Sequence, residues 1–315
     1  VLAFKLSIPK LGGGGGDVNT PDGTIKYVLN GLANNKPEVL LEAMPASYKQ
    51  TLNDGLKKSM ANVDMEIHAQ SVAVLQKFSG ILKNKKTLII EAANSAAQQS
   101  GAPSGEGLPP EVTENWDGAV SLLGIVVNSK LSDIAWVQNP DLGVFLKEDV
   151  GKLMGLPVLE TLVNKGISED LDPGAPKDMA QARKWIKGIE VTVISSTKTT
   201  TKVKLSSTDF MIPDGEGGLD MMKVEDRWLP KEVALGLDQV ITQIKAAVPM
   251  GSLADTGMNA QQKAVTMTFL KSCEEILDKI GEYNTGQDLM LYASGALGGL
   301  VLQLQQMQMA FPTPG

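Results

Sequence analysis

The sequence predicts an α+β protein that is predominantly helical, with a helical N-terminal half, a three-stranded antiparallel meander and a helical C-terminal region. Most of the chain repeats apolar residues at the spacing of one helix face. Only residues 188–230 combine β-branched residues with alternation at a period of two, which is typical of strands. The chain has 315 residues, of which 43% are hydrophobic and 21% charged, so it can bury a core and is not wholly disordered.

Residues 1–18 form a separate N-terminal segment in this interpretation. Apolar side chains alternate in the opening VLAFKLSIPKL at Leu2, Phe4, Leu6 and Ile8, and five glycines follow, Gly12–Gly16. We interpret the first part as a strand-like arm and the glycines as a flexible tether. A phosphate-binding glycine loop is the alternative, but neither a following Lys-Ser/Thr pair nor a Rossmann unit accompanies it, which favours the tether.

Residues 19–167 read as a series of helices. A cap residue and Pro21 precede a helical stripe that ends near Asn34–Asn35. Pro37 and Pro45 begin the next two helices, and a fourth closes at a lysine cluster that suits a helix C-terminus. After the loop at 100–110, further helical patterns cover 116–134, 141–147 and 149–165.

Residues 168–187, acidic and proline-containing at their start, are predicted as a boundary loop and helix, followed by the meander at 188–230. Its three strands are expected at 188–198, 199–210 and 219–230, with Val191, Val193, Val203 and Leu205 facing the core. Residues 231–315 are expected to be helices that pack on the meander. The segment 287–311 contains several glycines and alternates in LQLQQMQM, so both helix and strand remain open there, with helix favoured.

Composition excludes several function classes. The net charge is −7 and arginine occurs only at Arg183 and Arg227, which disfavours nucleic-acid binding. One cysteine, Cys273, and one histidine, His68, are too few for a Cys/His zinc site. No apolar run of about 20 residues predicts a transmembrane helix. The first residue is Val1, not Met, and a removed leader would explain this; we therefore expect an exported protein that is periplasmic, cell-surface or extracellular.

Two stretches carry a resemblance to known proteins. The segment TPDGTIKYVLNGLANNKPEVLLEAMPASY resembles the opening of exported NTF2-like (cystatin-like α+β) proteins, and MMKVEDRWLPKE resembles a strand of such proteins that ends in a Trp and a Pro. The segment from MPASYKQ to KKTLII is similar to uncharacterised exported proteins of planctomycete-type bacteria. The resemblance covers about residues 20–95 and 188–232. It implies a curved sheet around a helix, an elaborated NTF2-like cone, and it assigns no site residue.

The sequence offers few candidates for catalytic or metal-binding residues. His68 and Cys273 each lie on a predicted amphipathic helix, and structural roles are favoured over catalysis for both. No catalytic residue and no cofactor is assigned. The acidic loops are candidates for calcium, which takes oxygen ligands, although neither loop has EF-hand spacing and solvated turns are favoured. The candidate ligands are Asp170, Asp172, Asp214, Glu216 and Asp220.

These observations lead to two hypotheses of function. The first is a non-enzymatic structural or interaction protein whose arm, through Leu2, Phe4, Leu6 and Ile8, adds a strand to a sheet edge of another copy of the chain. The second is a ligand-binding or enzymatic NTF2-like domain with a pocket between the meander and the helices. Docking of the arm on its own domain also remains open.

Overall fold

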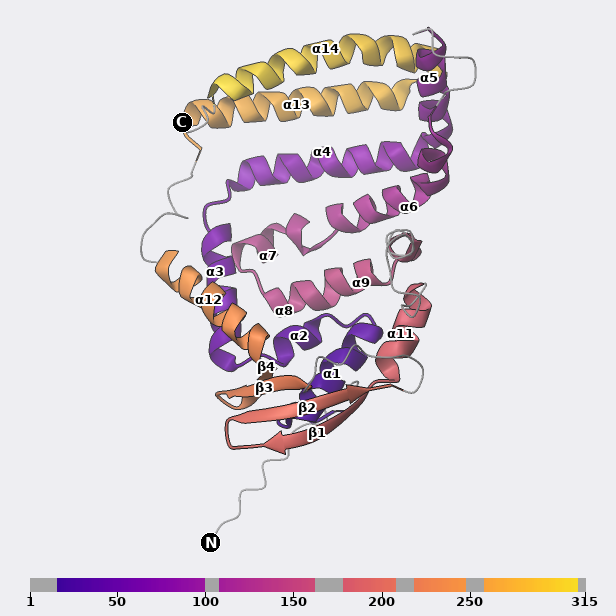
Figure 1. Cartoon of the computed structure of the whole chain (residues 1–315). Helices are drawn as coiled ribbons and strands as arrows, with labels where there is room; N and C mark the ends of the chain where they lie inside the picture. The colour runs from indigo at the N-terminus through magenta and orange to yellow at the C-terminus, as the bar shows by residue number, and fades with distance from the viewer. Residues whose placement is uncertain (1–15, 100–107, 162–177, 208–217, 248–257, 311–315) are drawn as a thin grey trace. The chain divides into compact units, whose positions relative to one another are not determined.

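The computed structural model describes residues 16–99, 108–161, 178–207, 218–247 and 258–310 (Figure 1). Within these ranges the protein is mostly helical with one small antiparallel sheet, as the sequence predicts. The described residues form two compact units. We call 16–53, 142–155, 159–161, 178–207 and 218–246 the sheet unit, and 54–99, 108–141, 156–158 and 258–310 the helical unit. The units cut across the linear division expected from the sequence, since each collects separated segments.

The N-terminal half is helical throughout its described part. Its elements are α1 (Pro21–Ala33), α2 (Glu38–Glu42), α3 (Ala46–Met60), α4 (Met65–Asn84), α5 (Lys86–Gln99), α6 (Pro110–Val127), η1 (Lys130–Ser132), α7 (Ile134–Gln138), α8 (Leu142–Phe145), the π-helical turn η2 (Leu146–Val150) and α9 (Gly151–Met154). The remaining elements are α11 (Met179–Lys187), β1 (Glu190–Ser196), β2 (Thr200–Ser206), β3 (Leu219–Val224), β4 (Arg227–Pro230), α12 (Lys231–Ala247), α13 (Ala260–Glu282) and α14 (Gly286–Ala310).

The sheet has four strands in the order β1-β2-β3-β4, all antiparallel, so the expectation of three strands is wrong. The expected third strand folds back on itself, because Glu225 and Asp226 form a tight turn that pairs Val224 with Arg227. Glu225 has a φ of 53°, a conformation that glycine or asparagine adopts more readily. The sequence offered no glycine or asparagine signal for this hairpin.

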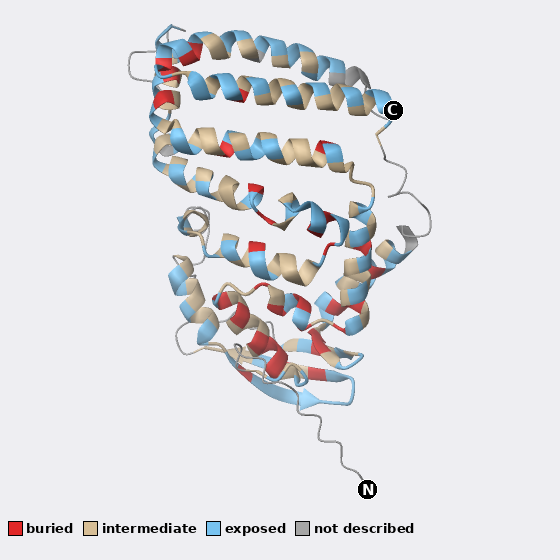
Figure 2. Ribbon diagram, turned by 180° about the vertical axis from the view of Figure 1, so that it is seen from behind, coloured by how far each residue is buried: buried red, intermediate tan, exposed pale blue. Residues whose placement is uncertain are grey.

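The core of the sheet unit lies between α1 and one face of the sheet. Ile25 of α1 packs with a cluster on the strands made of Val191, Val203, Met221 and Trp228. Of the four residues expected to supply this face, Val191 and Val203 are buried and Leu205 is half-buried. Val193 is 41% exposed, which corrects the expectation for that residue. In Figure 2 the buried positions of this unit gather on α1 and the strands.

A second cluster in the sheet unit joins α3 to α12. Tyr48 packs with Leu229, Ala234 and Ile241, and the Tyr48 hydroxyl donates a hydrogen bond to the Asp238 carboxylate. The first turn of α1 is capped by Thr20, whose side chain accepts from the Gly23 amide at 3.1 Å. These contacts hold α3 and α12 beside the sheet and fix the start of α1, next to the cavity described below.

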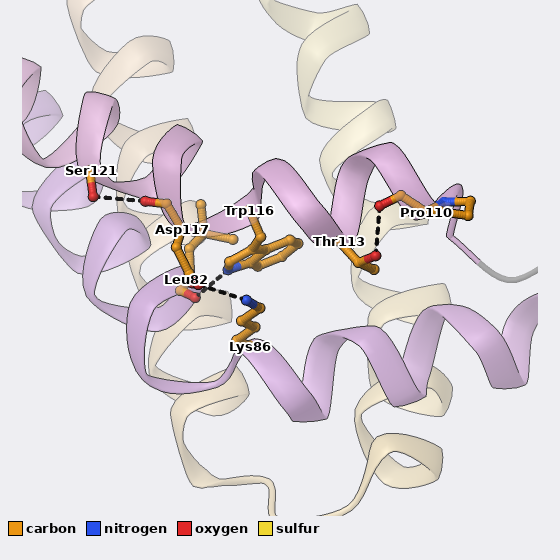
Figure 3. A network of polar contacts seen from close by, with 7 residues as sticks. All are labelled: Leu82, Lys86, Pro110, Thr113, Trp116, Asp117 and Ser121. Atoms are coloured by element: carbon orange, nitrogen blue, oxygen red, sulfur yellow. Dashed lines mark hydrogen bonds and ion pairs between the residues drawn. The ribbon is translucent and has the colours of Figure 1, made fainter. Parts of the chain in front are cut away.

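The helical unit packs α4, α6, α13 and α14 side by side, with α5 contacting α4 and α14 (Figure 1). α14 is helical over its whole length, which confirms the favoured interpretation of 287–310. Figure 3 shows how α6 is fixed to the end of α4 and the start of α5: the Trp116 indole donates to the Leu82 carbonyl at 3.0 Å, and the Lys86 ammonium of α5 pairs with Asp117 at 2.9 Å. None of the described helices is long and apolar enough to cross a membrane.

Candidate functional site

An apolar cavity lies within the sheet unit, between the strands and the helices α1, α2 and α12. Its volume is about 300 Å³. The residues around it come from six elements and their flanks: Thr24, Ile25, Val28, Leu29, Leu40, Ala43, Met44, Ile189, Leu205, Leu219, Leu229, Pro230, Val233 and Leu237. We call this space the aliphatic cavity, because all but one of these residues are aliphatic, methionine or proline.

The cavity exists because three elements converge on the sheet without filling the space between them. α1 places Ile25 against the strands, while α12 begins directly after β4 and carries Val233 and Leu237 past the same region. Ala43 follows α2 and is 2% exposed, so a small side chain occupies a fully enclosed position in the wall. Two lining residues, Leu40 at 42% and Val233 at 47%, are exposed to solvent and mark the mouth of the cavity.

The cavity contains nothing that resembles catalytic machinery. Among the described residues that line it, only Thr24 has a polar side chain, and its hydroxyl donates to the Val18 carbonyl at 2.9 Å. None of these described lining residues is charged, so a charged group inside would find no partner among them, which costs several kcal/mol. The cavity therefore suits an uncharged apolar group.

Two buried tyrosines in the same unit bond to carboxylates. The Tyr27 hydroxyl donates to Glu42, and burial, together with that hydrogen bond, raises the pKa of Tyr27. Burial, and next the hydrogen bond to Asp238, raises the pKa of Tyr48 to about 12. Both phenols stay protonated at neutral pH, so they act as donors that hold α1 to α2 and α3 to α12, not as bases.

The sheet offers a second feature, the outer edge of β1. Among the described residues β1 pairs only with β2, so its other side has no strand neighbour. Six of its seven residues are exposed, including Ile194 at 54%. The register shifts between Val193 and Ser195, which leaves Glu190–Val193 as the regular part of the edge.

His68 and Cys273 have separate local roles in the helical unit. The His68 Nε2 atom lies 2.7 Å from the Leu131 carbonyl oxygen, so that nitrogen carries the proton and donates. Burial raises the pKa of the Cys273 thiol, which lowers its thiolate fraction at neutral pH. The described contacts give neither residue the base, acid or nucleophile partner that catalysis requires.

Of the acidic calcium candidates, only Asp220 lies in the described chain. It is on β3, where its carboxylate is 3.8 Å from Lys202 on β2. Asp170, Asp172, Asp214 and Glu216, like the arm residues Leu2, Phe4, Leu6 and Ile8, lie outside the described residues. No group of three or more potential metal ligands occurs in the part of the chain that the structure describes.

The helical unit contains a larger but open groove of about 1060 Å³ between α13 and α14. Glu275, Asp278 and Glu282 line one side, and the rings of Tyr283 and Tyr292 lie 5.3 Å apart at one end. Lys77 of α4 pairs with Asp278 at 2.7 Å and with Glu274 at 3.0 Å. These charges tie α4 to α13, and no pair of them has the geometry of an acid–base dyad.

The sequence and the structure were compared with known proteins. No protein-family model, no curated protein and no solved structure matches this chain.

Proposed function

We propose that this chain is a non-enzymatic interaction protein that assembles with other copies of itself by strand addition, with the outer edge of β1 as the acceptor. The observation that carries the proposal is that β1 has a strand neighbour on one side only among the described residues and exposes six of its seven side chains. Natural sheets usually protect such an edge with lysine, proline or a covering segment. In β1 the only charged residue is Glu190.

The N-terminal arm is the segment that we propose adds to this edge as an extra strand. Leu2, Phe4, Leu6 and Ile8 share one face of an extended segment, and burying each would contribute about 1.5–3 kcal/mol. An isolated strand leaves its backbone donors and acceptors without partners, so pairing with an edge stabilises it further. The regular stretch Glu190–Val193 offers such a partner before the bulge.

The tether ends at a defined place in the sheet unit. A β carbon on Gly16 would meet the Gly23 carbonyl oxygen at 2.1 Å, so Gly16 lies against the backbone of α1, and α1 contacts β1. The seven residues between Ile8 and Gly16 span up to about 24 Å when extended. This reach allows the arm to pair with its own sheet or with that of another copy. We propose the second arrangement because a strand that pairs with its own sheet needs only a short connection.

The first test compares the full chain with a variant that lacks residues 1–11, by size-exclusion chromatography with light scattering. The full chain should form oligomers and the shortened chain should be a folded monomer. An unchanged mass after deletion, or a monomeric full chain at high concentration, would show that the arm does not drive assembly.

A second pair of variants tests the acceptor. Ile194→Lys places a charge on the proposed edge, and Leu235→Lys places the same charge on α12 at a residue with the same 54% exposure. Only Ile194→Lys should reduce oligomer formation. If both variants assemble like the unchanged chain, the acceptor is not β1.

The proposal also includes a fold arrangement and a cellular location. An elaborated NTF2-like arrangement is supported by α1 packing on the sheet, and an experimental structure of the assembled protein would test the cone. An exported location is a further part of the proposal, and fractionation of the producing cell would test it. Ligand binding between the meander and the helices, the second hypothesis, is supported by the aliphatic cavity.

A further inference from the structure

We infer that the aliphatic cavity is a binding site for an uncharged alkyl group, a function separate from assembly through β1. The cavity lies between packed elements of a single unit, and its volume of about 300 Å³ is at the lower end of the range for small-molecule sites. The part of its wall that the structure describes contains no charged and no aromatic residue. Such walls favour an uncharged aliphatic group, because they provide dispersion contacts and no partner for charge or ring stacking.

Water is a poor occupant of this space. A buried water molecule needs two to four polar partners, and the single polar side chain of the wall, Thr24, already donates to the Val18 carbonyl. Water at these walls finds few hydrogen-bond partners, and an apolar group that replaces it gains dispersion contacts with the aliphatic side chains. An apolar guest is thus stabilised by the walls and by its own removal from water.

The mouth indicates how the guest enters. Leu40 on α2 and Val233 on α12 line the cavity and are 42% and 47% exposed, so apolar side chains lead from solvent into the interior. Since no lining residue is charged, a polar head group would stay outside this opening while the chain lies within. At roughly 30 Å³ for each small group, the volume accommodates on the order of ten heavy atoms.

The probes are primary alkanols of about six to ten carbons, titrated into the full chain by calorimetry. Each added methylene should tighten binding about fourfold until the cavity is full, after which the gain should stop. Absence of binding across the series, or affinity that does not depend on chain length, would overturn the inference.

Matched variants locate the site. Val233→Trp should block the mouth and weaken binding at least about tenfold, whereas Val240→Trp, on the same helix at 43% exposure and outside the cavity, should bind like the unchanged chain. Leu40→Trp approaches the mouth from α2 and serves as a second blocking variant if Val233→Trp unfolds, as judged by circular dichroism. Equal binding by the blocking variants and Val240→Trp would overturn the assignment.

Two controls identify the natural occupant. Co-sedimentation with phosphatidylcholine vesicles that is lost in Val233→Trp would assign a bilayer acyl chain, and alkanol binding without co-sedimentation would assign a free alkyl compound. Both results support the inference. If alkanols bind only after residues 1–11 are deleted, the arm of this chain occupies the cavity and the inference is wrong. Monomeric protein that still binds alkanols would refute the proposed assembly alone.

Discussion

Gly218, at the start of β3, is the position where a single methyl group should disturb the sheet most clearly. Its φ is +78°, and a β carbon there would lie 2.5 Å from the carbonyl oxygen of Val203. Val203 is fully buried and pairs with Leu219, so this carbonyl has little freedom to move away. We expect Gly218→Ala to lower the free energy of unfolding of the sheet unit.

The expected size follows from three contributions. A left-handed conformation costs alanine about 1–2 kcal/mol relative to glycine. Displacing the Val203 carbonyl weakens the β2–β3 pairing, and one such hydrogen bond contributes about 1 kcal/mol. The reduced freedom of the unfolded chain offsets about 0.4–1 kcal/mol. The net loss should be about 1–3 kcal/mol, with the upper end reached if the strands separate locally.

The matched control is Gly236→Ala in α12 of the same unit, where a β carbon would meet nothing within 4 Å. Alanine is the better helix former, so this variant should gain about 0.5–1 kcal/mol. Urea unfolding followed by tryptophan fluorescence gives the stabilities, and hydrogen exchange of the β2 and β3 amides localises the change. If the two variants unfold at the same urea concentration, the close approach at Gly218 does not constrain the sheet.

Two further predictions concern the other contacts of the fold. Because the pKa of Tyr48 is raised to about 12 from 10.0, its protonated form stabilises the folded state below pH 10, and this stabilisation, up to about 2–3 kcal/mol, is lost as the pH rises toward 12. Tyr48→Phe should therefore lose less stability than the unchanged chain between pH 9 and pH 12, measured by urea unfolding; parallel losses would contradict this. Asn259→Ala should destabilise α13 by about 1 kcal/mol, because the Asn259 side chain accepts from the Gln262 amide at 2.9 Å, whereas Asn259→Asp should retain the cap; equal melting temperatures would contradict the capping role.

Local patterns in the sequence predicted the elements that depend on local physics. The alternation in 190–206 predicted β1 and β2, and Thr20 with Pro21 predicted the start of α1. The hairpin between β3 and β4 was missed because Glu225 adopts its left-handed conformation under the constraint of pairing between flanking strands. Pairing in the folded sheet supplies that constraint, and the turn contains no glycine or asparagine that would have predicted a hairpin.

The lining of the aliphatic cavity could not be predicted from the sequence either, because it depends on tertiary packing. Leu40 and Val233 each look like one more residue of a helical stripe, and only the packing of α2 and α12 around the sheet makes them the rim of a cavity. The sequence supported a pocket between the meander and the helices as one alternative, but it could not name the lining. In α14 the local sequence disfavours the observed structure, because glycines weaken a helix. The segment is nevertheless helical, and it packs against α5 and α13.

The discontinuity of the two units has a consequence for the order of events during synthesis. The sheet unit combines α1 with strands that begin at Glu190, and the helical unit combines α4 with α13, which begins at Ala260. At about 5–20 residues per second, α1 leaves the ribosome on the order of 10–30 seconds before its partner strands. During that interval the face of α1 that packs on the sheet lacks its native partner, and the face of α4 that packs on α13 waits for a comparable length of chain, so a chaperone that binds nascent chains would find targets on both helices.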